Sequence, residues 1–137
     1  CTNFKTHVMI KKILFLVFVI SLVSCKKQRV DDVQSDLTSK NGLVIVKLID
    51  DGENYIKKVE EYHFTFSSNG TVTAIKNNVT TTGTYRVYKD DRKIELEMQF
   101  DENSDLEELN EDWTFFSKEN GMLSFDEDDD FLVFKIK

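Results

Sequence analysis

The chain has 137 residues, 40% of them hydrophobic and 31% charged, which is enough for one domain with a core and leaves little room for a second. Its formal net charge is −7, and it contains two cysteines and two histidines. A strongly acidic chain is repelled by nucleic acid and by anionic membrane surfaces, so the net charge disfavours both as partners.

The first 24 residues differ in composition from everything that follows. Met9 precedes two lysines, Lys11 and Lys12, and an apolar run of 11 residues, ILFLVFVISLV, at positions 13–23. A short basic region before an apolar core of this length is typical of a secretory signal peptide. A membrane-spanning helix needs a longer run, of about 20 residues. We therefore expect residues 1–24 to be a signal peptide with an upstream leader before Met9.

The stretch Leu22-Val23-Ser24-Cys25 closes the apolar run and resembles the lipobox of bacterial lipoproteins. This resemblance implies cleavage before Cys25, attachment of a diacylglycerol to its thiol and acylation of its new amino group. No cysteine follows Cys25, so a disulfide within the mature chain is excluded. Two or more acyl chains make anchoring almost permanent. We expect a lipid-anchored protein of the cell envelope, in the outer membrane, on either its periplasmic or its surface face.

The segment 25–40, CKKQRVDDVQSDLTSK, is polar and contains no aromatic residue. Such a segment buries too little apolar surface to offset its ordering entropy, which predicts a flexible tether. The globular domain is then expected at 41–137. Without residues 1–24, which carry three lysines and no acid, the chain has 15 basic and 25 acidic residues and a net charge of −10.

Period-two alternation of apolar and polar residues predicts strands along the domain. It is clearest at 93–100, where Ile94, Leu96, Met98 and Phe100 alternate with polar residues. Four of the five glycines follow Asn or Asp, and such dipeptides favour tight hairpin turns. Eight strands are predicted, at 43–49, 61–67, 71–76, 82–88, 93–100, 112–118, 122–126 and 131–136.

Two segments interrupt the alternation. Residues 53–61, ENYIKKVEE, are expected to hold a short helical turn or an irregular crossover, and residues 105–112, DLEELNED, place Leu106 and Leu109 at helical spacing. Neither changes the predicted fold class, which is all-β. Eight short strands can close into an up-and-down antiparallel barrel that hides its edges, and a two-sheet β-sandwich is the alternative.

Several segments together resemble the bacterial lipocalin-like domain found in small lipoproteins. They are FTFSSNGTVTA at 64–74, TGTYRV at 82–87, ELEMQF at 95–100, LEELNEDW at 106–113 and FLVF at 131–134. The resemblance covers residues 60–137 and implies a lipocalin-like β-barrel on a lipid anchor. It brings no catalytic residues with it.

Catalytic groups are scarce after the predicted cleavage site. The one remaining histidine, His63, is out of phase with Tyr62 and Phe64 and is expected at the surface. The chain contains no nucleophile elbow, no zinc-binding HExxH and no nucleotide-binding glycine loop. We therefore expect a protein that is not an enzyme and that needs no cofactor.

The acidic run at 126–130, DEDDD, is the sharpest cluster of carboxylates. Alternate carboxylates from Asp126, Asp128 and Asp130 are a weak candidate for a Ca²⁺ site, because Ca²⁺ prefers several oxygen ligands. The run lacks the glycine and the closing Glu of a calcium loop, and a solvated hairpin loop is the favoured interpretation.

Aromatic residues are the remaining candidates for function, since pockets for lipophilic ligands are mostly apolar. The candidate lining residues are Tyr62, Phe64, Phe66, Tyr85, Phe100, Trp113 and Phe134, with Phe115 and Phe125 beside them. The first functional hypothesis is a lipid-anchored barrel that holds a small apolar ligand. The alternative is a structural or protein-interaction module of the envelope, an inhibitor or an assembly factor, in which the same aromatics fill the core.

Overall fold

The computed structural model describes residues 29–137. The predicted signal peptide and Cys25 lie outside the described residues, so cleavage and lipid attachment stay predictions. Among residues 29–137, no helix is both long enough and apolar enough to cross a membrane.

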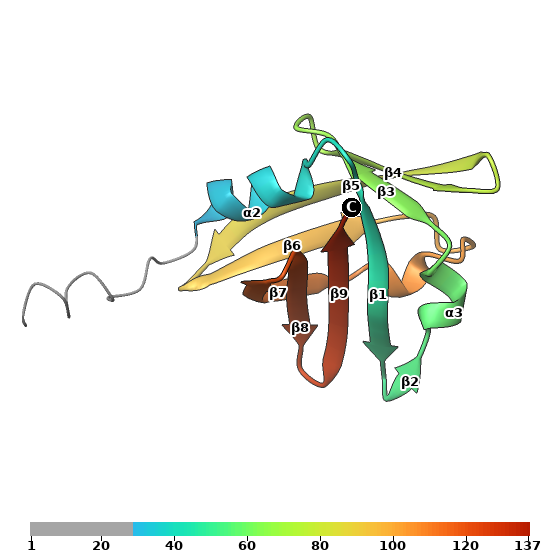
Figure 1. Cartoon of the computed structure of the whole chain (residues 1–137). Helices are drawn as coiled ribbons and strands as arrows, with labels where there is room; N and C mark the ends of the chain where they lie inside the picture. Colours follow the sequence, from blue (N-terminus) through green and yellow to red (C-terminus); the bar gives the residue numbers. More distant parts are fainter. Residues whose placement is uncertain (1–28) are drawn as a thin grey trace, which may run out of the picture.

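The strands form one continuous antiparallel barrel (Figure 1). From β3 onward each strand pairs with the next in sequence, and β1 closes the circle by pairing with both β3 and β9. A two-residue strand, β2 (Glu53–Asn54), is added to the edge of β1. The eight barrel strands are β1 (Leu43–Asp50), β3 (His63–Phe66), β4 (Thr71–Lys76), β5 (Val79–Asp90), β6 (Lys93–Gln99), β7 (Asp112–Glu119), β8 (Met122–Glu127) and β9 (Asp130–Ile136).

This topology confirms the predicted all-β class and the up-and-down barrel, and it excludes the sandwich. All eight predicted strands are present, and β5 is the one that extends furthest beyond its prediction. Tight turns with positive φ occur at Asp51-Gly52 and Asn120-Gly121, as the dipeptides predict. Gly83 has a different role, because a Cβ there would lie 2.6 Å from the Gln99 carbonyl oxygen and 2.7 Å from the Phe100 ring.

The helix α2 (Val30–Leu37) corrects the prediction of a flexible tether at 25–40. Its Val33 and Leu37 are fully buried in the core. The Gln34 side chain donates a 2.6 Å hydrogen bond to the Tyr85 hydroxyl, and Asp36 forms a 2.7 Å ion pair with Lys118 of β7. Two apolar residues four positions apart form one helical stripe, which is enough to dock this otherwise polar segment. The domain therefore includes α2, which lies ahead of residue 41.

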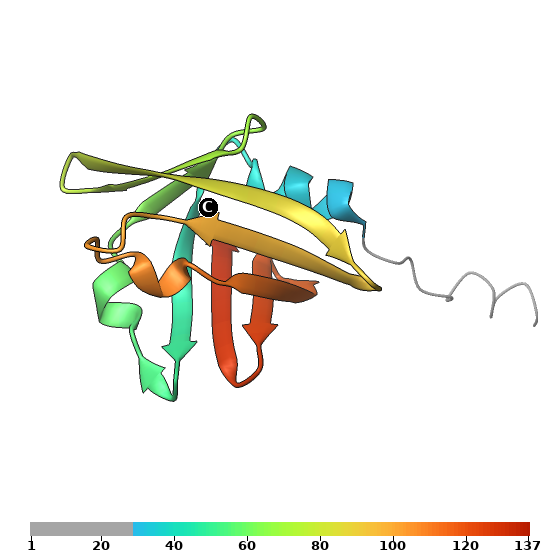
Figure 2. The same ribbon diagram turned by 180° about the vertical axis from the view of Figure 1, so that it is seen from behind.

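Short helical turns occur where the alternation is interrupted. The segment 53–61 contains β2 and the one-turn helix α3 (Ile56–Val59), and the segment 105–112 contains the 3-10 helix η1 (Glu107–Leu109). Leu106 and Leu109 are fully buried, and the Trp113 indole Nε1 donates a 3.1 Å hydrogen bond to the Leu109 carbonyl. Together with α2 on the other side, these elements cover the barrel core (Figures 1 and 2).

Candidate functional site

The predicted ligand-lining aromatics lie in the core. Tyr62, Phe64, Phe66, Tyr85, Phe100, Trp113 and Phe134 are all at most 8% exposed. Phe134 packs edge-to-face on three other rings, at centroid distances of 5.5 Å to Phe64, 5.6 Å to Phe66 and 6.3 Å to Phe125. Edge-to-face packing of this kind fills space and adds stability beyond area burial. These aromatic side chains therefore pack against one another in the interior of the barrel.

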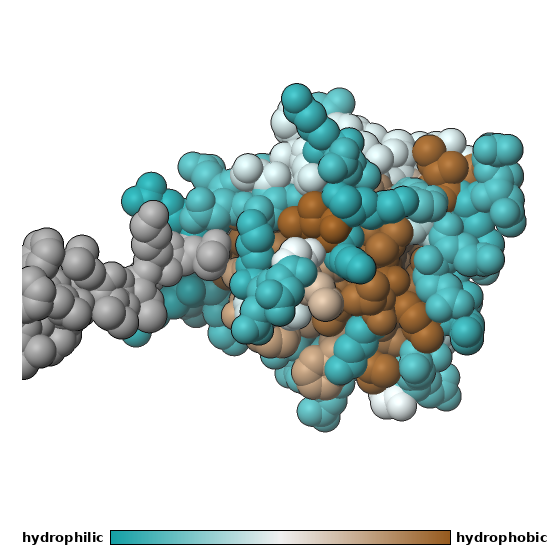
Figure 3. All heavy atoms as spheres, in the orientation of Figure 1, coloured by the Kyte–Doolittle hydropathy of each residue, from teal (hydrophilic) through white to brown (hydrophobic). Residues whose placement is uncertain are grey.

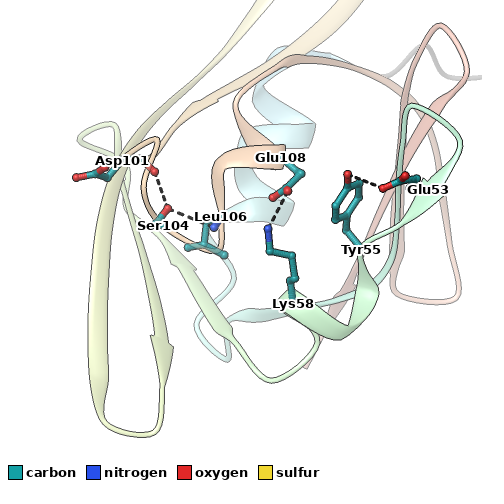
Figure 4. Close-up of polar contacts among 7 residues, drawn as sticks. All are labelled: Glu53, Tyr55, Lys58, Asp101, Ser104, Leu106 and Glu108. Carbon is teal, nitrogen blue, oxygen red and sulfur yellow. Dashed lines mark hydrogen bonds and ion pairs between the residues drawn. The ribbon is translucent and has the colours of Figure 1, made fainter.

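Polar contacts stabilise the end of the barrel that α3 and η1 cover, as Figure 4 shows. Lys58 of α3 forms a 2.9 Å ion pair with Glu108 of η1, whose side chain is 10% exposed. The Tyr55 hydroxyl donates to the Glu53 carboxylate at 3.0 Å, and the Ser104 hydroxyl accepts a bond from the Leu106 amide at 3.2 Å. The Lys58–Glu108 pair joins α3 to η1 across this end and so holds the two covering turns together.

Three carboxylates converge beside the β8–β9 turn. One oxygen each of Asp50, Glu111 and Asp130 lies within 4.8 Å of the others. Asp130 also accepts a 2.9 Å hydrogen bond from the Asp51 amide, which fixes its orientation. The predicted calcium ligands are not brought together as a set, because Asp130 joins Asp50 and Glu111 while Asp126 and Asp128 stay outside this group. Strand alternation places residues 126–130 in one loop. It cannot reveal that the partners of Asp130 are Asp50 of β1 and Glu111, the residue before β7.

The protonation of this carboxylate group is shifted by its surroundings. Burial and the neighbouring charge of Asp130 raise the pKa of Glu111 to about 8. The same two causes raise the pKa of Asp50 to about 6. The Glu111 Oε2 atom is buried and makes no hydrogen bond to the described residues. Close carboxylates in a partly dry site cannot all stay ionised, so the group holds a proton near neutral pH.

A cleft of about 910 Å³ lies between the start of α2, the β5–β6 turn and β7. Its apolar side chains are those of Val30, Ile94, Phe115 and Phe116. Its other lining residues are four exposed cations, Arg29, Lys89, Arg92 and Lys93. Of the nine aromatic residues that the sequence analysis names as candidate lining residues, Phe115 lines this cleft and the other eight do not.

A bulge in β7 shapes the cleft. Phe115 pairs with Phe125 and Ser117 pairs with Ser124, which leaves Phe116 as an extra residue without a partner on β8. In a regular strand two adjacent side chains point to opposite faces, whereas a bulge re-aims one of them. As a result Phe115 packs on Phe125 at 5.6 Å and also lines the cleft beside Phe116, which is 56% exposed.

The cleft cations differ from other basic residues of the barrel in their pairing. Five ion pairs occur within residues 29–137, through Lys57, Lys58, Lys76, Arg86 and Lys118. None of these pairs uses a cleft cation. Acidic residues are close in sequence, at Asp31, Asp32, Asp90 and Asp91, but they do not line the cleft. The cleft thus concentrates positive charge on an acidic protein.

Sequence reasoning missed this cleft, although two signals for it are present. Phe115 and Phe116 stand next to each other in a strand that otherwise alternates, which is what a bulge produces. The segment 89–93, KDDRK, places three cations in one predicted turn. What the sequence does not reveal is that α2 brings Arg29 to the same place.

His63 is exposed as predicted, with Nδ1 2.9 Å from the Lys137 Nζ atom.

Comparisons with known proteins support the fold. No family model matches the chain, and no curated protein matches it. Among solved structures, the chain is similar to the crystal structure of a DUF4847 family protein from Bacteroides vulgatus ATCC 8482. The TM-score is 0.54 at 17% sequence identity, over 77% of this chain and 97% of that one. At this identity the likeness shows a shared fold, the closed antiparallel barrel.

Proposed function

We propose that this protein is a lipid-anchored, non-enzymatic binding module of the cell envelope, acting through the lateral cleft. The observation that carries the proposal is the composition of the cleft, with four apolar side chains beside four cations that form none of the ion pairs described above. Ligand sites are mostly apolar with a few polar groups that fix orientation. Such a surface matches an amphipathic anion, with its apolar part on the phenylalanines and its acidic head on the cations.

The anchor part of this proposal rests on the sequence at Cys25. A lipobox-like stretch after a short apolar run, with no later cysteine, supports lipid attachment at that residue. The outer membrane is the proposed location.

Two cysteine variants test the anchor. The Cys25→Ala chain should lose incorporation of labelled palmitate and should no longer be processed before residue 25. The Cys1→Ala chain is the matched control, because it removes the only other cysteine, which lies in the predicted leader, and it should be labelled normally. Equal labelling of the two variants would contradict the proposed anchor.

Calorimetric titration tests the cleft. The probe is octyl phosphate, kept below its micelle concentration, and the acylated protein is held in zwitterionic nanodiscs. The double variant Lys89→Gln/Arg92→Gln should bind about tenfold more weakly, because charge-assisted hydrogen bonds to the phosphate are lost. The double variant Lys57→Gln/Lys76→Gln removes the same charge elsewhere and should bind normally. Unchanged affinity in the first variant would contradict a binding role for the cleft.

The outer surface of β1, β8 and β9 favours a second function, that of a protein-interaction module. Val46 of β1, Met122 of β8 and Phe131 of β9 are 42%, 39% and 36% exposed. Hydrophobic residues gather over β1 and its neighbours on the face seen in Figure 3. Exposed apolar surface on adjacent strands is a common feature of docking surfaces. Loss of a specific co-purifying envelope protein in the Val46→Ser variant, with the cleft variants unaffected, would favour this function.

A further inference from the structure

The anchor and the cleft are close in the chain. Four peptide units separate Cys25 from Arg29, and four residues span at most about 14 Å however they are arranged. Arg29 itself lines the cleft, together with Val30 at the start of α2. If lipid is attached at Cys25, the membrane surface must therefore lie near this end of the barrel.

The lining of the cleft favours anionic headgroups, although the exposed acids Asp31, Asp32, Asp90 and Asp91 flank it without lining it. The net charge of the protein is negative, which as a whole disfavours an anionic surface. The cleft nevertheless presents Arg29, Lys89, Arg92 and Lys93, and Lys26 and Lys27 lie between Arg29 and the anchor in sequence. Lys and Arg side chains near an anionic bilayer are attracted to its surface. Cations at one end of an acidic domain orient that domain as well as attract it.

Phe116 supplies an apolar contact for the same surface. Its ring is 56% exposed at the β7 bulge and lies in the lining of the cleft with Phe115. Aromatic side chains favour the boundary between headgroups and acyl chains, where their apolar ring leaves water.

From these observations we propose that the cleft is the face with which the barrel docks on the bilayer that holds its anchor. Phosphates of anionic phospholipids are bound by the four cations, and Phe116 lies among the headgroups. This inference rests on the lipid anchor of the proposed function and adds an orientation and a lipid class to it. The β4–β5 hairpin, at the far end of β5 from the β5–β6 turn, then points away from the membrane (Figures 1 and 2).

Tryptophan placed at two ends of the barrel tests the docking. The acylated full chain is reconstituted into vesicles of phosphatidylglycerol and brominated phosphatidylcholine, once as Phe116→Trp and once as Val79→Trp. Val79 is the matched control, because it is 65% exposed and begins β5 at the end opposite Lys89. Trp113 is buried in both variants and gives the same background.

Bromine quenches tryptophan fluorescence at short range, so the added emission of Phe116→Trp should be quenched at least about twofold more than that of Val79→Trp. Adding Lys89→Gln/Arg92→Gln, or replacing phosphatidylglycerol by a zwitterionic lipid, should reduce the quenching at position 116, whereas Lys57→Gln/Lys76→Gln should not. Equal quenching at 116 and 79, or stronger quenching at 79, would overturn the docking proposal.

A failure of the docking can be told apart from a failure of the anchor. If the protein is labelled at Cys25 and sediments with membranes while position 116 is not quenched, the anchor stands and the docking is wrong. If labelling does not depend on Cys25, the anchor itself is wrong, and the docking proposal falls with it.

Discussion

The barrel interior and the lateral cleft both contain aromatic residues, but these residues have different surroundings. In the interior, Phe134 is fully buried and touches three other rings edge-to-face. In the cleft, Phe116 is 56% exposed and lies in a lining that also holds four cations. Aromatic content alone therefore does not locate a binding surface. An exposed ring beside cations that form none of the ion pairs within residues 29–137 is the more informative sign of such a surface.

The largest expected difference between the two regions is in stability. Replacing Phe134 by Ala should lower the free energy of unfolding by about 3–5 kcal/mol, because it removes a ring from a packed core and leaves a cavity. Replacing Phe116 by Ala should change it by no more than about 0.5 kcal/mol, since its ring is largely solvated. Urea denaturation of both variants measures this contrast. Similar losses at the two positions would mean that the cleft ring is part of the core.

The next effect tests whether α2 belongs to the interior. The Leu37→Ala variant should lose about 2–5 kcal/mol of unfolding free energy, because Leu37 is fully buried although it lies in a predicted tether. The Ser35→Ala variant is a control on the exposed side of the same helix and should stay within about 0.5 kcal/mol of the parent. A Leu37→Ala protein as stable as the parent would mean that residues 30–37 belong to the flexible tether and not to the packed domain.

A close backbone approach gives a somewhat smaller effect. The Gly83→Ala variant should lose about 1–3 kcal/mol, because its Cβ would meet the Gln99 carbonyl and the Phe100 ring below 3 Å. Thr84→Ala, at the exposed neighbouring position, provides the comparison. If thermal denaturation finds Gly83→Ala as stable as Thr84→Ala, the interior is looser at β5 and β6 than described.

The smallest effect is the pH dependence of the carboxylate group. The pKa of Asp50 is raised to about 6 and that of Glu111 to about 8, so the folded state binds protons that the unfolded state has released. Stability from this group is complete below the usual carboxyl pKa, near 4, and is lost as pH rises to about 8. The melting temperature of the parent should fall between pH 5 and 8.5, and Glu111→Gln should make this fall smaller by about 2–5 °C.

Glu102→Gln is the matched control for the pH series, because Glu102 is exposed in the loop after β6. Its melting temperature should follow the parent curve. A Glu111→Gln curve that also follows the parent would show that this carboxylate group does not share a proton in the folded state.

Much of the fold could be predicted from the sequence because strand alternation and Asn-Gly or Asp-Gly turns are local signals. The β6 residues Ile94, Leu96 and Met98 are buried as their alternation predicts, and Asn120-Gly121 forms the expected turn. The exceptions have non-local causes. Glu95 is 7% exposed although it alternates with these residues, and its carboxylate accepts a bond from Thr114 of β7.

The candidate site could be predicted less well, because it is assembled from distant parts of the chain. Val33 and Leu37 give α2 only a short apolar stripe, and nothing local indicates that the stripe docks and brings Arg29 beside Lys89. The carboxylate group likewise joins Asp50, Glu111 and Asp130 from three separate segments. Composition shows which residue types the chain contains, whereas their grouping depends on tertiary structure.

Hydrogen exchange distinguishes a working surface at the cleft from one in the barrel interior. The acylated chain is compared in zwitterionic nanodiscs and in nanodiscs that contain phosphatidylglycerol, so that only the lipid headgroup changes. Slower exchange is predicted at residues 29–30, 89–94 and 115–116, with no change at 62–66, 75–79 or 132–134. Slowing confined to the interior strands or to the β4–β5 hairpin would contradict a working surface at the cleft.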